Sequence, residues 1–283
     1  MRDRGATVAV VEASTEALSG GWMEYVNVDV AVWTCFEDEP RHAALHGGTE
    51  AYLKTKLALF ESLHDPEQQR AVVNIDDAAA KRVLEVTTVP TVTYSVRDRR
   101  ADVWAESVQL TSWETEVIVR VPGGRRLQIV SSLVGRHNVY NILAAVAVGV
   151  VLDAPLEALV AGIEAVTVIP GRGEVVNADP DDPVLRADFP VIVDAADSPA
   201  RVATLLDSIL ARERRAPAVR QWIAHRAHGE ASGSGRIFTV LACDGETTDK
   251  AMRTQVCWLR GKGKGGRACP RLGRRARRAP PRS

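Results

Sequence analysis

The feature that most constrains the fold is an alternation of short β-branched runs with segments of helical periodicity. Apolar runs occur at residues 7–12 and 29–34, and a third, at residues 72–75, ends in Asp76-Asp77. Between the last two runs, apolar residues over 48–63 recur at the three- and four-residue spacing of a helix. Near-continuous apolar strands are typical of parallel sheets covered on both faces. The pattern therefore predicts an α/β fold.

The middle of the chain changes to shorter strands followed by two helices. The pair Gly123-Gly124 is typical of a hairpin turn, which predicts a small antiparallel part. A strongly apolar segment over 136–152 is too short to span a bilayer and predicts a buried helix, and a second helix is predicted over 155–166. The strands of this part are predicted at 91–96, 106–110, 114–121 and 127–131.

After residue 168 the pattern indicates a second unit. The sequence Pro-Gly-Arg-Gly at 170–173 interrupts the helical periodicity, and residues 177–190 are rich in Asp and Pro, which predicts a loop. Residues 216–235 are irregular and end like a linker. The regular elements expected here are a strand at 191–194, an amphipathic helix at 199–212 and a strand at 237–241.

The formal net charge of zero conceals a strong asymmetry. Ten of the 36 basic residues lie after position 259, where there is no Asp or Glu. The rest of the chain therefore has 26 basic residues and all 36 acidic ones, so it is acidic. A tail of this composition cannot bury a core and is expected to be disordered. It could contact nucleic acid electrostatically, but no aromatic residues are interleaved to stack on bases.

Cysteine usage and the chain's apolar runs limit the compartment. The four cysteines have neither zinc-ligand nor redox spacing, which favours free thiols in a reducing compartment. No apolar run has the length of a membrane span, and the N-terminal residues show neither a signal peptide nor a transit segment. We therefore expect no membrane association and no visible targeting segment. The cysteines are Cys35, Cys243, Cys257 and Cys269.

The segment over 135–145 reads G-R-H-N-V-Y-N-I-L-A-A. It resembles the G-x-H-N-x-x-N-x-x-A-A segment of the Mur ligases, the ATP-dependent amide ligases that build the peptide of peptidoglycan. Asn138 and Asn141 are three residues apart and share a helix face. Their amides can both donate to and accept from an adenine edge. The resemblance implies that both bind ATP, while Asn138 as a plain helix N-cap is the alternative.

Further segments resemble the family in the same order, over roughly the first 250 residues. They are most similar to the MurE type (UDP-N-acetylmuramoyl-tripeptide synthetases), and within it to the plant and algal plastid branch. The resemblance implies a Mur ligase central domain at 1–168, with a parallel sheet flanked by helices and a small antiparallel part. It further implies a partial, Rossmann-like C-terminal domain at 169–250 and a basic low-complexity tail at 251–283.

The resemblance also implies a metal and substrate side near the N-terminus. The sequence E-A-S-T-E-A-L at 12–18 is similar to E-V-S-S-H-x-L, which implies that Glu12 is a Mg²⁺ ligand and that Ser14 faces the uridine nucleotide. A capping Ser beside a solvated acid is the alternative. His42 matches a family histidine on the metal or phosphate side, and a solvated loop histidine is its alternative. The family His of the first segment is Glu16 here.

Lys56 matches the lysine that is carbamylated in the family. A carbamate replaces the ammonium by an anionic oxygen ligand that can hold a second Mg²⁺. This chemistry requires a lysine kept neutral by burial or by nearby cations. A surface lysine on an amphipathic helix is the alternative.

Two residues of the second unit match nucleotide contacts. Arg172 in P-G-R-G-E is similar to the family Arg that reaches the ATP phosphates, and Asp194 in D-A-A-D-S-P is similar to the family Asp that binds the ribose hydroxyls. The chain departs from the family motifs at other positions. These departures are Cys35, Arg41, Ala195 and Asp197.

The phosphate-binding G-x-x-x-x-G-K-[ST] motif does not occur in this sequence. The Gly-Lys repeats at 261–266 do not match it, and no strand is predicted directly before them. Two interpretations follow. One is a MurE-type ligase that adds diaminopimelate or lysine to UDP-N-acetylmuramoyl-L-alanyl-D-glutamate through an acyl phosphate, with this chain inactive as given. The other is a non-catalytic MurE-like scaffold of the plastid transcription machinery, with RNA polymerase as partner. The expected location is the plastid stroma in a plant or alga and the cytoplasm in a bacterium.

Overall fold

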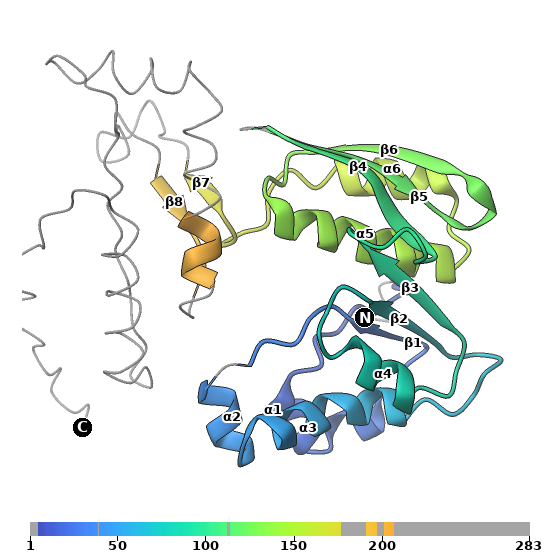
Figure 1. Cartoon of the computed structure of the whole chain (residues 1–283), viewed down its shortest axis with the longest axis vertical. Coiled ribbons are helices and arrows are strands. Elements are labelled where there is room, and N and C mark those ends of the chain that lie inside the picture. The colour runs from blue at the N-terminus through green and yellow to red at the C-terminus, as the bar shows by residue number, and fades with distance from the viewer. Residues whose placement is uncertain (1–4, 39, 112–113, 177–190, 197–200, 207–283) are drawn as a thin grey trace, which may run out of the picture.

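The structure, a computed structural model, describes residues 5–38, 40–111, 114–176, 191–196 and 201–206 (Figure 1). It contains a six-stranded sheet in the order β1-β2-β3-β4-β5-β6 and a two-stranded sheet, β7-β8. The strands are β1 (Val30–Trp33), β2 (Arg70–Asn74), β3 (Thr91–Ser95), β4 (Val103–Leu110), β5 (Thr115–Arg120), β6 (Arg126–Ser131), β7 (Glu174–Val176) and β8 (Val191–Val193).

The helices lie mainly between the parallel strands and after the antiparallel ones. They are α1 (Thr15–Ser19), α2 (Pro40–His46), α3 (Thr49–Glu61), α4 (Ala80–Val86), α5 (Arg136–Val151) and α6 (Leu156–Glu164), with 3₁₀ turns η2 (Trp22–Tyr25) and η3 (Pro122–Gly124). None of the described helices is long and apolar enough to cross a membrane.

The large sheet has a parallel and an antiparallel half. Strands β1 to β4 pair in parallel, and β4 pairs with β5, and β5 with β6, antiparallel. The turn between β5 and β6 uses Gly123 at φ 81° and Gly124 at φ 73°, a backbone region that glycine enters without strain. The α/β fold predicted from the sequence, with a small antiparallel part, is thereby confirmed.

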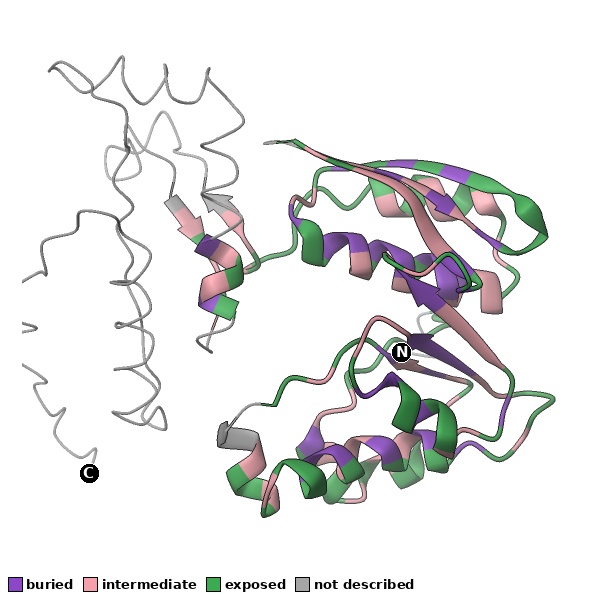
Figure 2. Cartoon of the chain, viewed as in Figure 1, coloured by how far each residue is buried: buried purple, intermediate pink, exposed green. Residues whose placement is uncertain are grey.

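Alternation along the central strands separates two hydrophobic cores. Val72 of β2 points to the face covered by α5, while its neighbours Ala71 and Val73 point to the face covered by α3 and α4. Figure 2 shows the buried residues along the facing sides of the sheet and these helices. Because both faces of the parallel half are covered, the inner residues of β2, Ala71 to Val73, have to be apolar on both faces.

Polar residues at the end of β2 and directly after it fix the carboxyl end of β1. The Asn74 side chain donates from Nδ2 to the carbonyl oxygen of Thr34 at 2.7 Å. The Asp77 carboxylate accepts hydrogen bonds from Trp33 Nε1 and from the backbone N–H of Phe36, both at 2.9 Å, and from the N–H of Ala79 at 3.0 Å. The chain that leaves β1 is therefore held against the end of β2.

The sequence prediction for residues 7–12 is wrong. These residues form no strand, and Val10 is 97 % exposed. A β-branched run needs a neighbouring strand to satisfy its backbone groups, and among the described strands β1 pairs only with β2. Propensity alone therefore could not decide the conformation of this segment.

Most other predicted elements are confirmed with ends shifted by one to three residues, as expected where helices fray and strands stop pairing. The short helices α1, α2 and α4 and the strand β7 were not predicted. Of the helix predicted at 199–212, residues 201–206 are described and helical. The loop predicted at 177–190, the strand at 237–241 and the basic tail lie outside the described residues.

We expect the substitution Asp77→Ala to lower the free energy of unfolding by about 2–4 kcal/mol, because it leaves the indole N–H of the buried Trp33 and two backbone N–H groups without their acceptor. Urea denaturation followed by tryptophan fluorescence measures the loss. The control is Glu85→Ala, which removes an exposed partner 3.8 Å from Lys81 and should cost less than about 0.5 kcal/mol. Equal losses in both variants would contradict the role of Asp77.

Candidate functional site

The described polar residues with matching motifs lie in separate places: two at the beginning of α5, which starts beside the carboxyl end of β3, two beside the small sheet, and the N-terminal ones on the side of α3. Ligands of open α/β sheets bind outside the carboxyl ends of the strands, because loops and helix N-termini converge there. In Figure 1, α5 lies across the face of the sheet, with β7 and β8 near its N-terminal end. This region joins the large sheet to the small one.

The first turns of α5 position two asparagines. Asn138 is buried, its Nδ2 donates to the carbonyl oxygen of Val134 at 3.0 Å, and its Oδ1 accepts from Asn141 Nδ2 at 3.1 Å. The N-cap of α5 is Gly135, so the alternative of Asn138 as the N-cap is wrong. Each amide retains one further donor hydrogen or lone pair, which is the capacity that an adenine edge would use.

A tight turn before β7 brings Arg172 and Asp194 together. The N–H of Gly173 donates to Asp194 Oδ2 at 2.7 Å, and the N–H of Ala195 donates to the carbonyl oxygen of Gly171 at 2.9 Å. Gly171 at φ 69° and Gly173 at φ 61° supply the left-handed backbone that this turn requires. Arg172 is exposed between them. The Asp194 carboxylate, which follows β8, is thus bonded to the residue next to Arg172.

His137 is the residue of α5 on which the charge of Asp194 acts. Burial lowers the pKa of His137, and the Asp194 carboxylate acts in the opposite direction. Of the four residues that the sequence assigned to ATP, Asn138 and Asn141 are bonded to each other, and Asp194 is bonded to the residue that follows Arg172.

Lys56 lies on α3 beneath the segment that contains Glu12. Its Nζ donates to the carbonyl oxygen of Ala13 at 3.0 Å. Burial lowers the pKa of Lys56, while the carboxylates of Glu12 and Glu16 oppose that shift. Lys56 is therefore half-buried rather than fully exposed, and its role as the carbamylated lysine stays a prediction.

The N-terminal residues show a mixed outcome. Ser14 is the N-cap of α1, since its Oγ accepts from the N–H of Ala17 at 3.2 Å, so the capping alternative for Ser14 is observed. This cap does not exclude a substrate contact, because a hydroxyl can donate while it accepts. Glu12 is exposed on an irregular segment near Lys56.

The described residues do not preassemble a metal centre. No three His, Cys, Asp or Glu side chains group together among them. His42 belongs to α2, and its side chain is outside the described part, so its role stays a prediction. Mg²⁺ usually keeps several waters and takes one or two carboxylates plus substrate phosphates. Glu12 can supply one carboxylate to such a site, which it would share with substrate phosphates. The described residues offer no group of side chains that would hold the ion without substrate.

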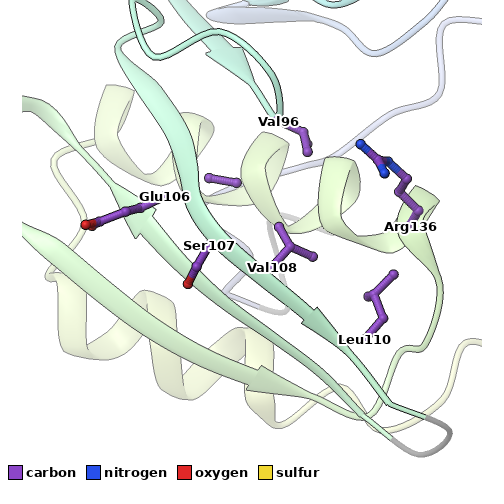
Figure 3. A pocket seen from close by; sticks show the side chains of 7 residues that line it. Val96, Glu106, Ser107, Val108, Leu110 and Arg136 are labelled. Carbon is purple, nitrogen blue, oxygen red and sulfur yellow. The ribbon is translucent and has the colours of Figure 1, made fainter. Parts of the chain in front are cut away.

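A cavity of about 340 Å³ adjoins the same end of α5 (Figure 3). It lies between the end of β3, strand β4 and the first residue of α5. Figure 3 shows Arg136 extending toward Val96, while Glu106 and Ser107 point away from the Val108 side. The lining residues are Val96, Ala105, Glu106, Ser107, Val108, Leu110 and Arg136.

Sequence reasoning did not assign three polar residues of this region. His137, Tyr140 and Asp76 lie at or next to the first turns of α5, and Asp76 is bonded to the end of β3. His137 and Tyr140 stood inside the family motif, and Asp76 followed a predicted strand. The position of Asp76 after a parallel strand was the available signal.

Comparison with known proteins gives a consistent result. Residues 1–149 match the Mur ligase middle domain. The chloroplastic UDP-N-acetylmuramoyl-L-alanyl-D-glutamate–2,6-diaminopimelate ligase MurE homolog of Arabidopsis thaliana is 38% identical over 248 residues, which are 87% of this chain and 28% of that protein. The corresponding ligase of Bacillus velezensis is 30% identical over 260 residues, which are 90% of this chain and 46% of that protein.

Solved structures agree in fold. A UDP-N-acetylmuramoyl-L-alanyl-D-glutamate–2,6-diaminopimelate ligase superimposes with a TM-score of 0.60 at 25% identity, over 74% of this chain and 41% of that one. The MurF ligase of Thermotoga maritima in complex with ADP gives a TM-score of 0.52 at 18% identity, over 67% and 40%. The chain thus spans less than a third of the plant relative and about half of the bacterial one.

We expect Asp194→Asn to shift the titration of His137 to lower pH, because it removes the carboxylate that favours the imidazolium. The His137 Hε1 resonance, followed by NMR from pH 4 to 8, measures the shift. Asp153→Asn, at the opposite end of α5, is the matched control and should leave the titration in place. An unchanged His137 titration in Asp194→Asn would show that the second sheet does not face α5.

Proposed function

The chain belongs to the Mur ligase family, and from that premise we propose that it is the nucleotide-binding part of a MurE-type amide ligase. Such a ligase joins diaminopimelate or lysine to UDP-N-acetylmuramoyl-L-alanyl-D-glutamate. ATP supplies a phosphoryl group that converts the substrate carboxylate into an acyl phosphate, which an amine then attacks. The partners are accordingly a UDP-muramyl peptide, an amino acid and ATP with Mg²⁺.

The observation that carries this proposal is the pair Asn138 and Asn141 at the start of α5, together with Asp194 bonded to the turn that contains Arg172. The carboxylate of Asp194 can accept from both hydroxyls of a ribose, and the amides of Asn138 and Asn141 can pair with an adenine edge. Arg172, which directly precedes Gly173, is exposed. The N–H donors of its guanidinium have a planar geometry that suits phosphate oxygens. Base, sugar and phosphate thus each have a group of fitting chemistry.

The environment of Lys56 supports its assignment as the carbamylated lysine. Only a neutral amine attacks CO₂, and burial shifts this amine toward the neutral form. Once formed, the carbamate would offer anionic oxygens beside Glu12. The carboxylates of Glu12 and Glu16 work against this chemistry, because both favour the ammonium.

We assign residues 1–168 to the central domain, 169–250 to part of the C-terminal domain and 251–283 to a basic tail. The sequence contains no G-x-x-x-x-G-K-[ST] motif to hold the transferred phosphoryl group. We therefore infer that the chain as given binds the base and ribose of the nucleotide but does not turn ATP over.

A second candidate is a non-catalytic scaffold in the plastid transcription machinery, with RNA polymerase as partner. It is favoured by the departures at Glu16, Cys35, Arg41, Ala195 and Asp197, which remove side chains of the family motifs. The chloroplastic plant relatives accord with a plastid location. Co-purification of polymerase subunits with the tagged chain from plastids would favour this candidate, and recovery of the chain free of them would exclude it.

We expect the chain to bind mant-ADP, with Asp194→Ala and Asn138→Ala each weakening the affinity by about tenfold or more, because each removes one set of hydrogen bonds to the nucleotide. Fluorescence titration measures the dissociation constants. Asp153→Ala is the control and should bind like the unmodified chain. Failure of the unmodified chain to bind at millimolar nucleotide would refute the proposal.

The predicted incompetence has its own test. With ATP, Mg²⁺, UDP-muramyl-dipeptide and diaminopimelate, the chain should release no ADP above the background of a coupled assay. ADP formation that depends on both substrates would overturn the inference and show that this chain completes the reaction.

We expect ¹³C-bicarbonate at pH 8 to give a carbamate signal in the ¹³C NMR spectrum that is lost in Lys56→Gln. Glu16→His should strengthen the signal, because it removes a carboxylate that holds the amine protonated. A signal that persists in Lys56→Gln, or that weakens in Glu16→His, would contradict the assignment of Lys56.

A further inference from the structure

We propose that the face of β4, β5 and β6 that lies opposite α5 binds single-stranded nucleic acid through a row of arginines that contains one tryptophan. This arginine row consists of Arg99, Trp104, Arg120 and Arg126. None of its residues belongs to the proposed nucleotide site, so the inference does not depend on the function proposed above.

The antiparallel strands bury one of their two faces against helices. Val117, Val119 and Ile129 point to the core that these strands share with α5 and α6. The residues between them point to the opposite face, where Gln128 is exposed and Val130 is 40 % exposed. Antiparallel sheets commonly pack one face on a core and leave the other in water. In the part of the chain that the structure describes, the face opposite α5 is therefore a solvent-facing surface.

The register of the strands places the arginine row on this surface. Trp104 of β4 is paired with Arg120 of β5, and Arg120 is paired with Arg126 of β6. Directly opposed residues of antiparallel strands point to the same face, so these three side chains form a line across the sheet. Arg99, in the turn before β4, lies over the indole ring of Trp104, with its guanidinium carbon 5.5 Å from the ring centroid. The row therefore continues from the strands into that turn.

A β-bulge places a carboxylate among the arginines. The register of β4 against β5 shifts at Glu106, and Figure 3 shows Glu106 pointing away from the Val108 side. Its Oε2 accepts from Nε of Arg120 at 2.7 Å and lies 3.0 Å from Nε of Arg126. One carboxylate thus orients two guanidinium groups but neutralises the charge of only one of them.

Positive charge exceeds negative charge around the row. Arg125, in the turn between β5 and β6, adds a fourth guanidinium to the three of the row. Glu106 and Asp102 supply two carboxylates, while Asp98 is neutralised by Arg100, whose Nη2 is 2.6 Å from its Oδ2. By contrast, the chain apart from its C-terminal basic residues has 26 basic and 36 acidic residues. A local excess of positive charge on an acidic chain attracts a polyanion.

Trp104 favours a nucleic acid over an acidic peptide as the ligand. Guanidinium groups bind phosphates and carboxylates alike, so the arginines alone do not distinguish the two. Bases stack on aromatic rings and on guanidinium planes, and Trp104 with Arg99 over its ring offers both. A duplex keeps its bases stacked inside, whereas an unpaired strand can turn them toward such a platform. The ligand that fits the whole row is therefore a single strand of RNA or DNA.

Fluorescence anisotropy of labelled oligouridylate and oligothymidylate, titrated with the full chain, tests the proposal. Arg99→Ala and Arg126→Ala should each weaken binding about three- to tenfold, because each removes a cation that contacts phosphate. The dependence of log affinity on log salt concentration should become shallower by about 0.7 in each variant. The matched control is Arg82→Ala, which removes an exposed arginine on the side of the large sheet that α3 and α4 cover. This control should bind like the unmodified chain.

Two further variants test how the row works. Glu106→Gln should tighten binding about two- to fivefold, because it removes a charge that competes with phosphate for Arg120 and Arg126. The hydrogen bond from Arg120 holds the pKa of Glu106 below its usual range, so this carboxylate is charged at neutral pH. Trp104→Leu should weaken the binding of both oligonucleotides about fivefold or more and leave the binding of polyglutamate unchanged.

The outcomes separate the row from the other basic residues of the chain. Binding of either oligonucleotide with these losses supports the proposal, and the tighter of the two identifies RNA or DNA as the ligand. Losses in Arg99→Ala and Arg126→Ala no larger than in Arg82→Ala would assign the binding to the basic residues after position 259 and overturn the proposal. An equal loss of polyglutamate binding in Trp104→Leu would overturn it in favour of an acidic peptide. Weaker binding in Glu106→Gln, or no binding of either oligonucleotide by the unmodified chain, would also contradict it.

Discussion

The carboxyl edge of the parallel sheet depends on the polar residues at the end of β2, because these hold together strands that are far apart in the sequence. Asn74 and Asp77 bind the end of β1, and Asp76 binds the end of β3. Hydrophobic burial brings the helices onto the sheet, but it is non-directional. Hydrogen bonds to the half-buried carboxylates of Asp76 and Asp77 fix how the three strand ends lie relative to one another.

The proposed nucleotide site also includes the second sheet. The turn around Arg172 is closed by the N–H of Gly173, which donates to Asp194, by the N–H of Gly171, which donates to Glu174, and by the carbonyl oxygen of Gly171, which accepts from Ala195. The charge of Asp194 acts on His137 of α5. Lys56 and Glu12, by contrast, lie on the side of the large sheet that α3 covers.

Much of the fold was predictable because burial leaves a period in the sequence. The apolar run of β2 and the helical spacing in α3 and α5 each indicated the correct element. Residues 7–12 carried an equally strong β-branched pattern and are nevertheless irregular, because strand formation needs a partner that local sequence does not encode. The candidate site residues were assigned through family motifs rather than periodicity. Asp76 was not assigned, because its bonded partners, Ser95 and Val96, are 19 and 20 positions away.

The central claim is that a nucleotide binds where α5 meets the Asp194 turn. Addition of ADP to the ¹⁵N-labelled chain, followed by amide chemical shifts, tests it most directly. The account predicts that the largest saturable shifts lie at residues 137–141, 171–173 and 194–195. Saturable shifts confined to the cavity beside β4, at residues 105–110, or the absence of saturable shifts at millimolar ADP, would contradict it.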